Sequence, residues 1–216
     1  MVLKSRAGHR YGIYHIKGTN GSGKTTLLNS ILKYERAVDI DNHLTLKRML
    51  VNVSPENIRV IDRDPVIFNC LQTFNEQILG PVISNLFDWK IFLMDKVRDL
   101  LSDELINELL YMFSQMEWDF YDRVGGGFSS GEKILISVMR ALASWDKTVS
   151  ILVVDECTAF LDDQVRSLFL RCLLELSAST AVYLSAHEEI HGCTQINKTD
   201  FSAQTIAIYA HGHSVL

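Results

Sequence analysis

The chain lacks the features that mark a secreted or membrane-spanning protein. It has only four cysteines in 216 residues, and none forms a CxxC pair or a His/Cys cluster with zinc spacing. We therefore expect reduced, mostly buried thiols in a cytosolic protein. No apolar run approaches the ~18 residues of a membrane span. No apolar segment follows the charged N-terminal residues either, so we expect no signal peptide, and any membrane role requires a partner.

An excess of positive charge is missing as well. The formal net charge is -5 and the pI is near 5.8, which argues against a broad nucleic-acid-binding face but leaves room for a local basic patch. We expect no nucleic acid among the partners. Internal repeats and low-complexity tracts are also absent, and the length fits one large domain or one domain with an inserted subdomain.

The pattern of apolar residues predicts a wound α/β core that is interrupted by helices. We expect strands at residues 11–16, 38–41, 58–62, 149–154, 181–185 and 205–209, and helices at 25–34, 133–143 and 164–177. A longer helical block runs from about residue 73 to residue 118. This order is typical of an α/β fold with a mostly parallel sheet and a helical insertion.

A glycine-rich loop follows the first expected strand. Residues 18–25 read GTNGSGKT and satisfy G-x-x-x-x-G-K-[ST] in full. Glycines let backbone N–H groups approach phosphate oxygens, and the helix that begins near Lys24 directs its positive dipole end at the same anion. Lys24 is expected to reach the β- and γ-phosphates, and the Thr25 hydroxyl to ligate Mg²⁺. The expected phosphate-binding residues are Gly18, Thr19, Asn20, Gly21, Ser22, Gly23, Lys24, Thr25 and Thr26.

An acidic pair ends the most apolar of the expected strands. Asp155 and Glu156 directly follow residues 149–154, which read VSILVV. Ligands of parallel sheets lie at the carboxyl ends of strands, so Asp155 is expected to hold the hydration shell of Mg²⁺ and Glu156 to polarise the attacking water. Such a pair alone more often caps a helix or lies in a solvated turn. The glycine-rich loop upstream favours the catalytic interpretation.

Four motifs resemble those of the ABC ATPases, and along the chain they follow one another in the same order as in that family. GTNGSGKTTLLN is similar to their phosphate-binding loop, and DECTAFLD at residues 155–162 to their D-E-P-T-S-A-L-D. FSSGEK at residues 128–133 resembles their signature L-S-G-G-Q-[KR], and His187 follows an apolar strand at the place of their switch histidine. The resemblance implies a P-loop NTPase core in which residues 1–68 form the first half, 69–130 a helical subdomain with the signature, and 131–216 the second half.

The resemblance also implies a catalytic cycle with ATP and Mg²⁺. Two such domains would pack head to tail, and the hydroxyl of Ser129 and the N–H of Gly131 would contact the ATP of the opposite subunit. Ser130 and Glu132 belong to the same turn, and His187 would contact the γ-phosphate, so that Lys24, Glu156 and His187 are the expected catalytic residues. From the residues alone, Ser129 or Ser130 would cap a helix with Glu132 in its first turn. Both interpretations can hold together.

A further stretch is similar to the Q-loop of ABC exporters. Residues 62–68, followed by 73–78, match its pattern, which implies a transmembrane domain or subunit as partner and a location on the cytoplasmic face of the membrane. In such exporters a groove between the Q-loop and the helical insertion receives a helix of the membrane domain. Six apolar residues could line this docking groove or build the subdomain's own core: Val66, Ile67, Phe68, Phe74, Ile78 and Leu79.

The chain departs from the family pattern at several positions. Arg63 stands where the Q-loop has glutamine, and a guanidinium cannot ligate Mg²⁺. Ser130 replaces the second signature glycine, and Glu132 replaces the signature glutamine. Only 17 residues precede Gly18, so we expect a shortened N-terminal β subdomain. Tyr11 or Tyr14 would then have to stack on adenine, unless both are ordinary strand residues.

The expected function is that of an ATP-hydrolysing subunit of an exporter-type ABC transporter, which dimerises on ATP to drive a membrane partner. One alternative is a soluble ABC ATPase of DNA repair or chromosome maintenance, which FSSGEK favours and the lack of a heptad insertion and a basic face disfavours. Another is an ATP-gated regulatory subunit with weak hydrolysis. Arg63 and Ser130 favour that alternative, whereas the intact Lys24, Asp155 and Glu156 argue against it.

Overall fold

The computed structural model of the protein describes residues 11–17, 24–25, 28, 55–67, 73–122, 128–186 and 194–197. The chain forms two compact units. The first consists of residues 1–58, 148–159 and 177–216, and the second of residues 59–147 and 160–176. The expected strands at 38–41 and 205–209, and Cys70 and Cys193, lie outside the described residues. The division into 1–68, 69–130 and 131–216 stays a prediction.

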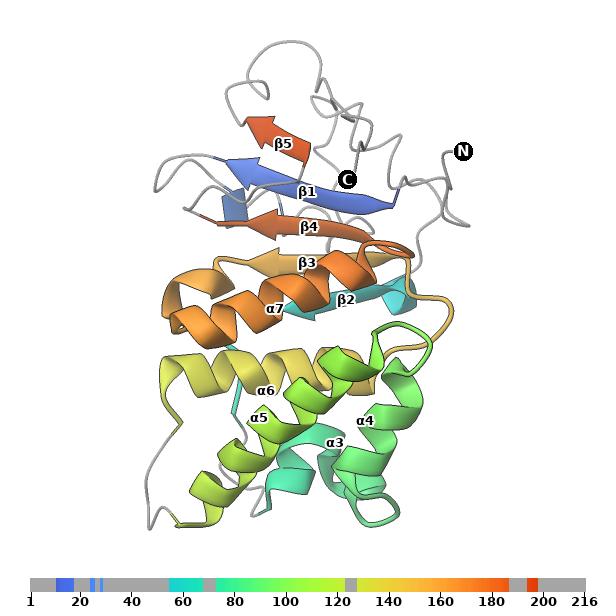
Figure 1. Cartoon of the computed structure of the whole chain (residues 1–216), viewed down its shortest axis with the longest axis vertical. Helices are drawn as coiled ribbons and strands as arrows, with labels where there is room; N and C mark the ends of the chain where they lie inside the picture. The colour runs from blue at the N-terminus through green and yellow to red at the C-terminus, as the bar shows by residue number, and fades with distance from the viewer. Residues whose placement is uncertain are drawn as a thin grey trace. The chain divides into compact units, whose positions relative to one another are not determined.

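The first unit is built on parallel strands (Figure 1). They are β1 (Gly12–Lys17), β3 (Ile151–Asp155), β4 (Ala181–Ser185) and β5 (Thr194–Asn197). The order in the sheet is β2-β3-β4-β1-β5, where β2 (Ile58–Ile61) is the strand in which one unit passes into the other. β4 pairs in parallel with both β1 and β3, and Ser185 lies opposite Ile16 on one side and Asp155 on the other. These three strands therefore end at the same edge of the sheet.

Buried apolar side chains explain why these segments form the centre of the sheet. All five residues of β4 and the first four of β3 are buried, which is typical of parallel strands covered on both faces. The rings of Tyr14 and Tyr183 stack with centroids 5.1 Å apart. Burial raises the pKa of the Tyr183 hydroxyl. Because Tyr14 is 5% exposed, its interpretation as an ordinary strand residue is confirmed.

The second unit is helical. It contains α3 (Phe74–Ser84), α4 (Trp89–Val97), α5 (Asp103–Asp122), α6 (Ser130–Ala143) and α7 (Asp163–Leu176). Thr73 and Glu76 form a capping box at the start of α3. The expected block of residues 73–118 is divided because Gly80 has a positive φ of 76° before Pro81, and because Asp88 caps a new helix, α4.

Aromatic residues form the core of the helical unit. The ring of Trp89 meets those of Phe74 and Phe113 edge to face, at 5.8 and 6.2 Å between centroids. Phe74, Ile78 and Leu79 are 0%, 6% and 9% exposed. For these three residues the structure supports the alternative that they build the subdomain's own core, because their side chains are buried within the unit.

The remaining members of that set differ in exposure. Val66 is 67% exposed and Ile67 is partly buried, while Phe68 lies outside the described residues. Cys157 and Cys172 are buried, reduced thiols, as expected. In the part of the chain that the structure describes, no helix is both long and apolar enough to cross a membrane.

Candidate functional site

The described part of the glycine-rich loop begins at its lysine. Lys24 and Thr25 are helical, as is Leu28, which is 1% exposed. The predicted residues Gly18, Thr19, Asn20, Gly21, Ser22, Gly23, Thr26 and His187 lie outside the described residues. The side chain of Leu28, one turn after Lys24, is buried.

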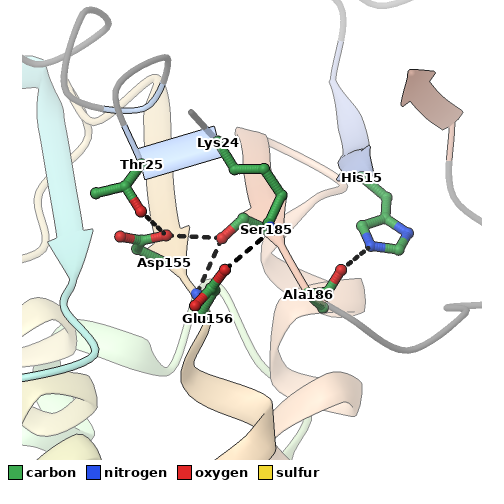
Figure 2. A network of polar contacts seen from close by, with 7 residues as sticks. All are labelled: His15, Lys24, Thr25, Asp155, Glu156, Ser185 and Ala186. Atoms are coloured by element: carbon green, nitrogen blue, oxygen red, sulfur yellow. Dashed lines mark hydrogen bonds and ion pairs between the residues drawn. The ribbon is translucent and has the colours of Figure 1, made fainter. Parts of the chain in front are cut away.

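Four predicted residues lie close together at the carboxyl edge of the sheet. The ammonium of Lys24 is 3.2 Å from Oε1 of Glu156, and the two side chains are only 3% and 13% exposed. The hydroxyl of Thr25 donates a hydrogen bond of 3.4 Å to Oδ1 of Asp155. Figure 2 shows these side chains pointing toward one another from two segments far apart in the sequence. The fold thus places the lysine and threonine of the loop against the acidic pair.

Ser185 is a further member of this cluster and was not predicted from the sequence. Its hydroxyl donates a 2.7 Å hydrogen bond to Oδ1 of Asp155 and accepts one of 3.0 Å from the backbone N–H of Glu156. The same N–H also lies 3.0 Å from the carbonyl oxygen of Ser185. The sequence signal that could have predicted this role was a polar residue at the carboxyl end of the apolar strand AVYLS. In parallel sheets, functional residues lie at the carboxyl ends of the strands.

The backbone of Glu156 adopts an unusual conformation. Its φ is 47°, the one positive value among the described residues other than glycine. A left-handed backbone conformation at a glutamate costs free energy that surrounding contacts must offset, and residues in such conformations cluster at functional sites. Here the two acceptors on Ser185 hold the N–H of Glu156, and the turn directs its carboxylate to Lys24.

The oxygen atoms of this cluster suit a hard cation. Thr25 offers a hydroxyl and Asp155 a carboxylate, and Mg²⁺ prefers oxygen ligands of this kind. Ser185 already donates to one oxygen of Asp155, which orients the carboxylate. The donor set therefore fits the expected metal, and the ammonium of Lys24 beside it fits a phosphate.

The signature-like turn forms the N-terminus of α6. Ser129 is the N-cap, and its hydroxyl accepts a 3.3 Å hydrogen bond from the N–H of Glu132. The carboxylate of Glu132 in turn accepts a 2.7 Å bond from the N–H of Ser129. This capping box explains a glutamate at the fourth position of SSGE. Ser129 and Ser130 are exposed, so their polar groups face solvent at a helix N-terminus.

Gly131 in that turn lies against the chain after the acidic pair. A Cβ at Gly131 would be 3.0 Å from the carbonyl oxygen of Phe160, closer than almost all Cβ contacts. The ring of Phe160 also lies 5.9 Å from the guanidinium carbon of Arg63. A side chain at 131 would therefore need the main chain at Phe160 to shift by a few tenths of an ångström. Arg63 has an aromatic partner that its sequence context did not indicate.

Two further contacts lie beside predicted residues. The Nε2 of the fully buried His15 donates to the carbonyl oxygen of Ala186, 3.1 Å away, which is the residue before His187. Arg140 of α6 donates to the carbonyl oxygens of Val66 and Gln77, at 2.6 and 2.7 Å. Partial burial lowers the pKa of Arg140.

Comparison with known proteins agrees with the motifs. The family described as ABC transporter matches residues 3–159. The multidrug resistance-like ATP-binding protein MdlB of Buchnera aphidicola is 25% identical over 182 residues, which cover 79% of this chain and 28% of that protein. The glutathione/L-cysteine transport system ATP-binding/permease protein CydD of Haemophilus influenzae is 29% identical over 194 residues, with 83% and 29% covered.

The solved structures agree on the fold. A bacterial Atm1-family ABC exporter with ATP bound matches with a TM-score of 0.58 at 17% identity, over 88% of this chain and 32% of that one. The expected α/β fold of the P-loop ATPases is thereby confirmed. The chain spans less than a third of the length of these relatives.

Proposed function

This chain belongs to the ABC transporter family as one of its ATP-binding ATPase domains, and on that premise we propose that it powers an exporter by closing on Mg·ATP with a second ATPase subunit. The observation that carries the proposal is the convergence of Lys24, Thr25, Asp155 and Glu156 at one edge of the sheet. Each of these groups suits one part of nucleotide binding or hydrolysis.

The phosphate side of the site rests on Lys24. Its ammonium is nearly buried and is paired with Glu156 at 3.2 Å. Charges out of water need a partner, and the γ-phosphate of ATP would supply one in place of the carboxylate. Glu156 would then be released to accept a proton from the attacking water, the role of a general base.

Thr25 and Asp155 would hold the metal. Mg²⁺ bound there would neutralise charge that develops on the phosphate oxygens. Asp155 is oriented for this by the hydroxyl of Ser185, which donates to Oδ1 at 2.7 Å. The residues of the loop that lie outside the described part, Gly18 to Gly23 and Thr26, would supply backbone N–H groups to the phosphates, and His187 would contact the γ-phosphate.

The second subunit would complete the site with its signature turn. α6 begins with Ser129 as N-cap, and a helix N-terminus carries partial positive charge that favours phosphate. The exposed Ser129 hydroxyl and the N–H of Gly131 would bind the ATP held by the opposite subunit. Ser130 and Glu132 would flank it, with the Glu132 carboxylate retained by the cap.

A transmembrane partner would dock on the helical unit. Large apolar side chains are exposed where α3 ends and α4 begins: Val82 at 75%, Leu86 at 72%, Phe87 at 49% and Ile91 at 69%. Exposed patches of this kind mark interaction sites. CydD is named as a combined ATP-binding/permease protein, and this chain spans 29% of it. We assign the patch to a permease domain or subunit, which would hold the ATPase at the cytoplasmic face of the membrane.

Steady-state hydrolysis of ATP by the purified chain tests the proposal. We expect phosphate release with Mg²⁺ and none with EDTA. Glu156→Gln should lower turnover by about 10²–10⁴-fold while ATP still binds. The exposed carboxylate of Asp99 offers a matched control, because Asp99→Asn makes the same chemical change away from the site. Equal turnover in wild type and Glu156→Gln would contradict the assignment of the base.

A further inference from the structure

Two positions at which the chain departs from the family motifs are in contact with each other. Arg63 replaces the glutamine of the Q-loop, and Phe160 replaces the alanine of D-E-P-T-S-A-L-D. The guanidinium carbon lies 5.9 Å from the centroid of the phenyl ring, within the range of a cation–π interaction. Arg63 is exposed and Phe160 is 45% exposed, so the pair is not needed to fill the core.

The backbone of Phe160 contacts the signature turn. Its carbonyl oxygen would lie 3.0 Å from a Cβ at Gly131, so the main chains of the two residues are packed closely. Gly131 is the second residue of α6, immediately after the capping serine and Ser130. Phe160 therefore contacts Arg63 through its ring and the start of α6 through its main chain.

The segments on both sides of this contact are fixed. The N–H of Asp62 donates to the hydroxyl of Ser137 at 3.2 Å, and Arg140 donates to the carbonyl oxygen of Val66 at 2.6 Å. Both Ser137 and Arg140 belong to α6. After Phe160, the carbonyl oxygen of Leu161 accepts a 2.9 Å hydrogen bond from Arg166 of α7. Arg63 and Phe160 thus meet between segments that these hydrogen bonds attach to α6 and α7.

We propose that Arg63 and Phe160 are a positioning pair that sets the signature turn, residues 129–131, for the ATP of the opposite subunit. The pair's role rests on the proposed function, because it concerns how the ATP-bound dimer closes. A guanidinium cannot ligate Mg²⁺. By pairing with Phe160, Arg63 links the Q-loop segment to the signature turn and not to the metal. The pair governs dimer closure and leaves ATP binding by the single subunit unchanged.

A double-mutant cycle tests the coupling. In the Glu156→Gln background, the Mg·ATP-driven dimerisation constant is measured by sedimentation for the parent, Arg63→Met, Phe160→Leu and the double variant. We expect each single change to weaken dimerisation. The fold-loss of dimerisation in the double variant should be about two- to five-fold smaller than the product of the two single fold-losses, as for an exposed cation–π pair. Arg63→Lys and Phe160→Tyr, which keep the cation and the ring, should restore most of the loss.

The outcomes separate this inference from the proposed function. A parent that binds Mg·ATP and never dimerises contradicts the proposed function, and the positioning role with it. A parent that dimerises, with effects of Arg63→Met and Phe160→Leu that simply multiply, overturns the positioning pair alone. The positioning role is also overturned if the single variants lose Mg·ATP affinity as monomers, because the pair would then act on nucleotide binding. A thermal scan of each variant confirms that it is folded.

Discussion

Replacing Ser185 with alanine removes the hydroxyl that joins the two acidic residues of the site. That hydroxyl donates to Asp155 at 2.7 Å and accepts from the N–H of Glu156 at 3.0 Å. The N–H keeps a second acceptor, the carbonyl oxygen of residue 185, so the main loss is the bond to the carboxylate. A hydrogen bond to a charged group contributes about 1.5–3 kcal/mol.

The expected cost of Ser185→Ala is therefore about 1.5–3 kcal/mol in the free energy of unfolding. For a chain of this size that corresponds to a fall in Tm of about 3–12 °C. Asp155 would also lose the donor that orients it, so we expect a higher Mg²⁺ concentration for half-maximal ATPase activity. Urea unfolding gives the first quantity, and a Mg²⁺ titration of phosphate release gives the second.

Ser150 provides the matched control. It too is a buried serine, 6% exposed, and within the described part of the chain its hydroxyl has no hydrogen-bond partner. Removing an unpaired buried hydroxyl is nearly neutral or stabilising, so Ser150→Ala should leave both measurements almost unchanged. If Ser185→Ala and Ser150→Ala unfold at the same urea concentration and need the same Mg²⁺, the hydroxyl of Ser185 does not hold the acidic pair.

Three other expectations concern binding, capping and pH. Lys24→Ala should weaken ATP binding more than tenfold by calorimetry, because the ammonium would neutralise the phosphates, whereas the exposed Lys147→Ala should not. Ser129→Ala removes the N-cap of α6 and should cost about 1 kcal/mol of stability in urea, with Ser129→Asn close to wild type. Burial raises the pKa of the Cys172 thiol from 9.0 to about 12. Because the pKa of this thiol is higher in the folded than in the unfolded chain, its contribution to the free energy of unfolding is full below about pH 9 and is lost between about pH 9 and pH 12. When unfolding is followed across that range, Cys172→Ala should lack this loss of stability.

The elements with strong periodicity could be predicted from the sequence. The strand at 181–185 and the helix that follows the signature agree with β4 and α6, because apolar spacing and the Ser129–Glu132 cap act locally. β5 was missed, since TQIN is short and polar and is a strand through its pairing with β1. The block at 73–118 is helical as expected, but the breaks that Gly80 and Asp88 make in it were not predicted.

The site was predicted where a motif states the chemistry, and missed where distant residues meet. Lys24, Thr25, Asp155 and Glu156 carry recognisable spacing, and the structure brings them together. Ser185 belongs to no motif that we used, and its role follows from the register that places it opposite Asp155. The contact between Arg63 and Phe160 depends on the packing of α6 against the chain after the acidic pair, which a linear pattern does not contain.

The most direct test of the central claim is the mass of the Glu156→Gln protein in solution, with and without Mg·ATP. We predict a monomer without nucleotide and a dimer with it, because the signature turn of one subunit would complete the phosphate site of the other and the variant would hydrolyse ATP too slowly to reopen. A protein that binds Mg·ATP and keeps the monomer mass would contradict a site shared between two copies of this chain.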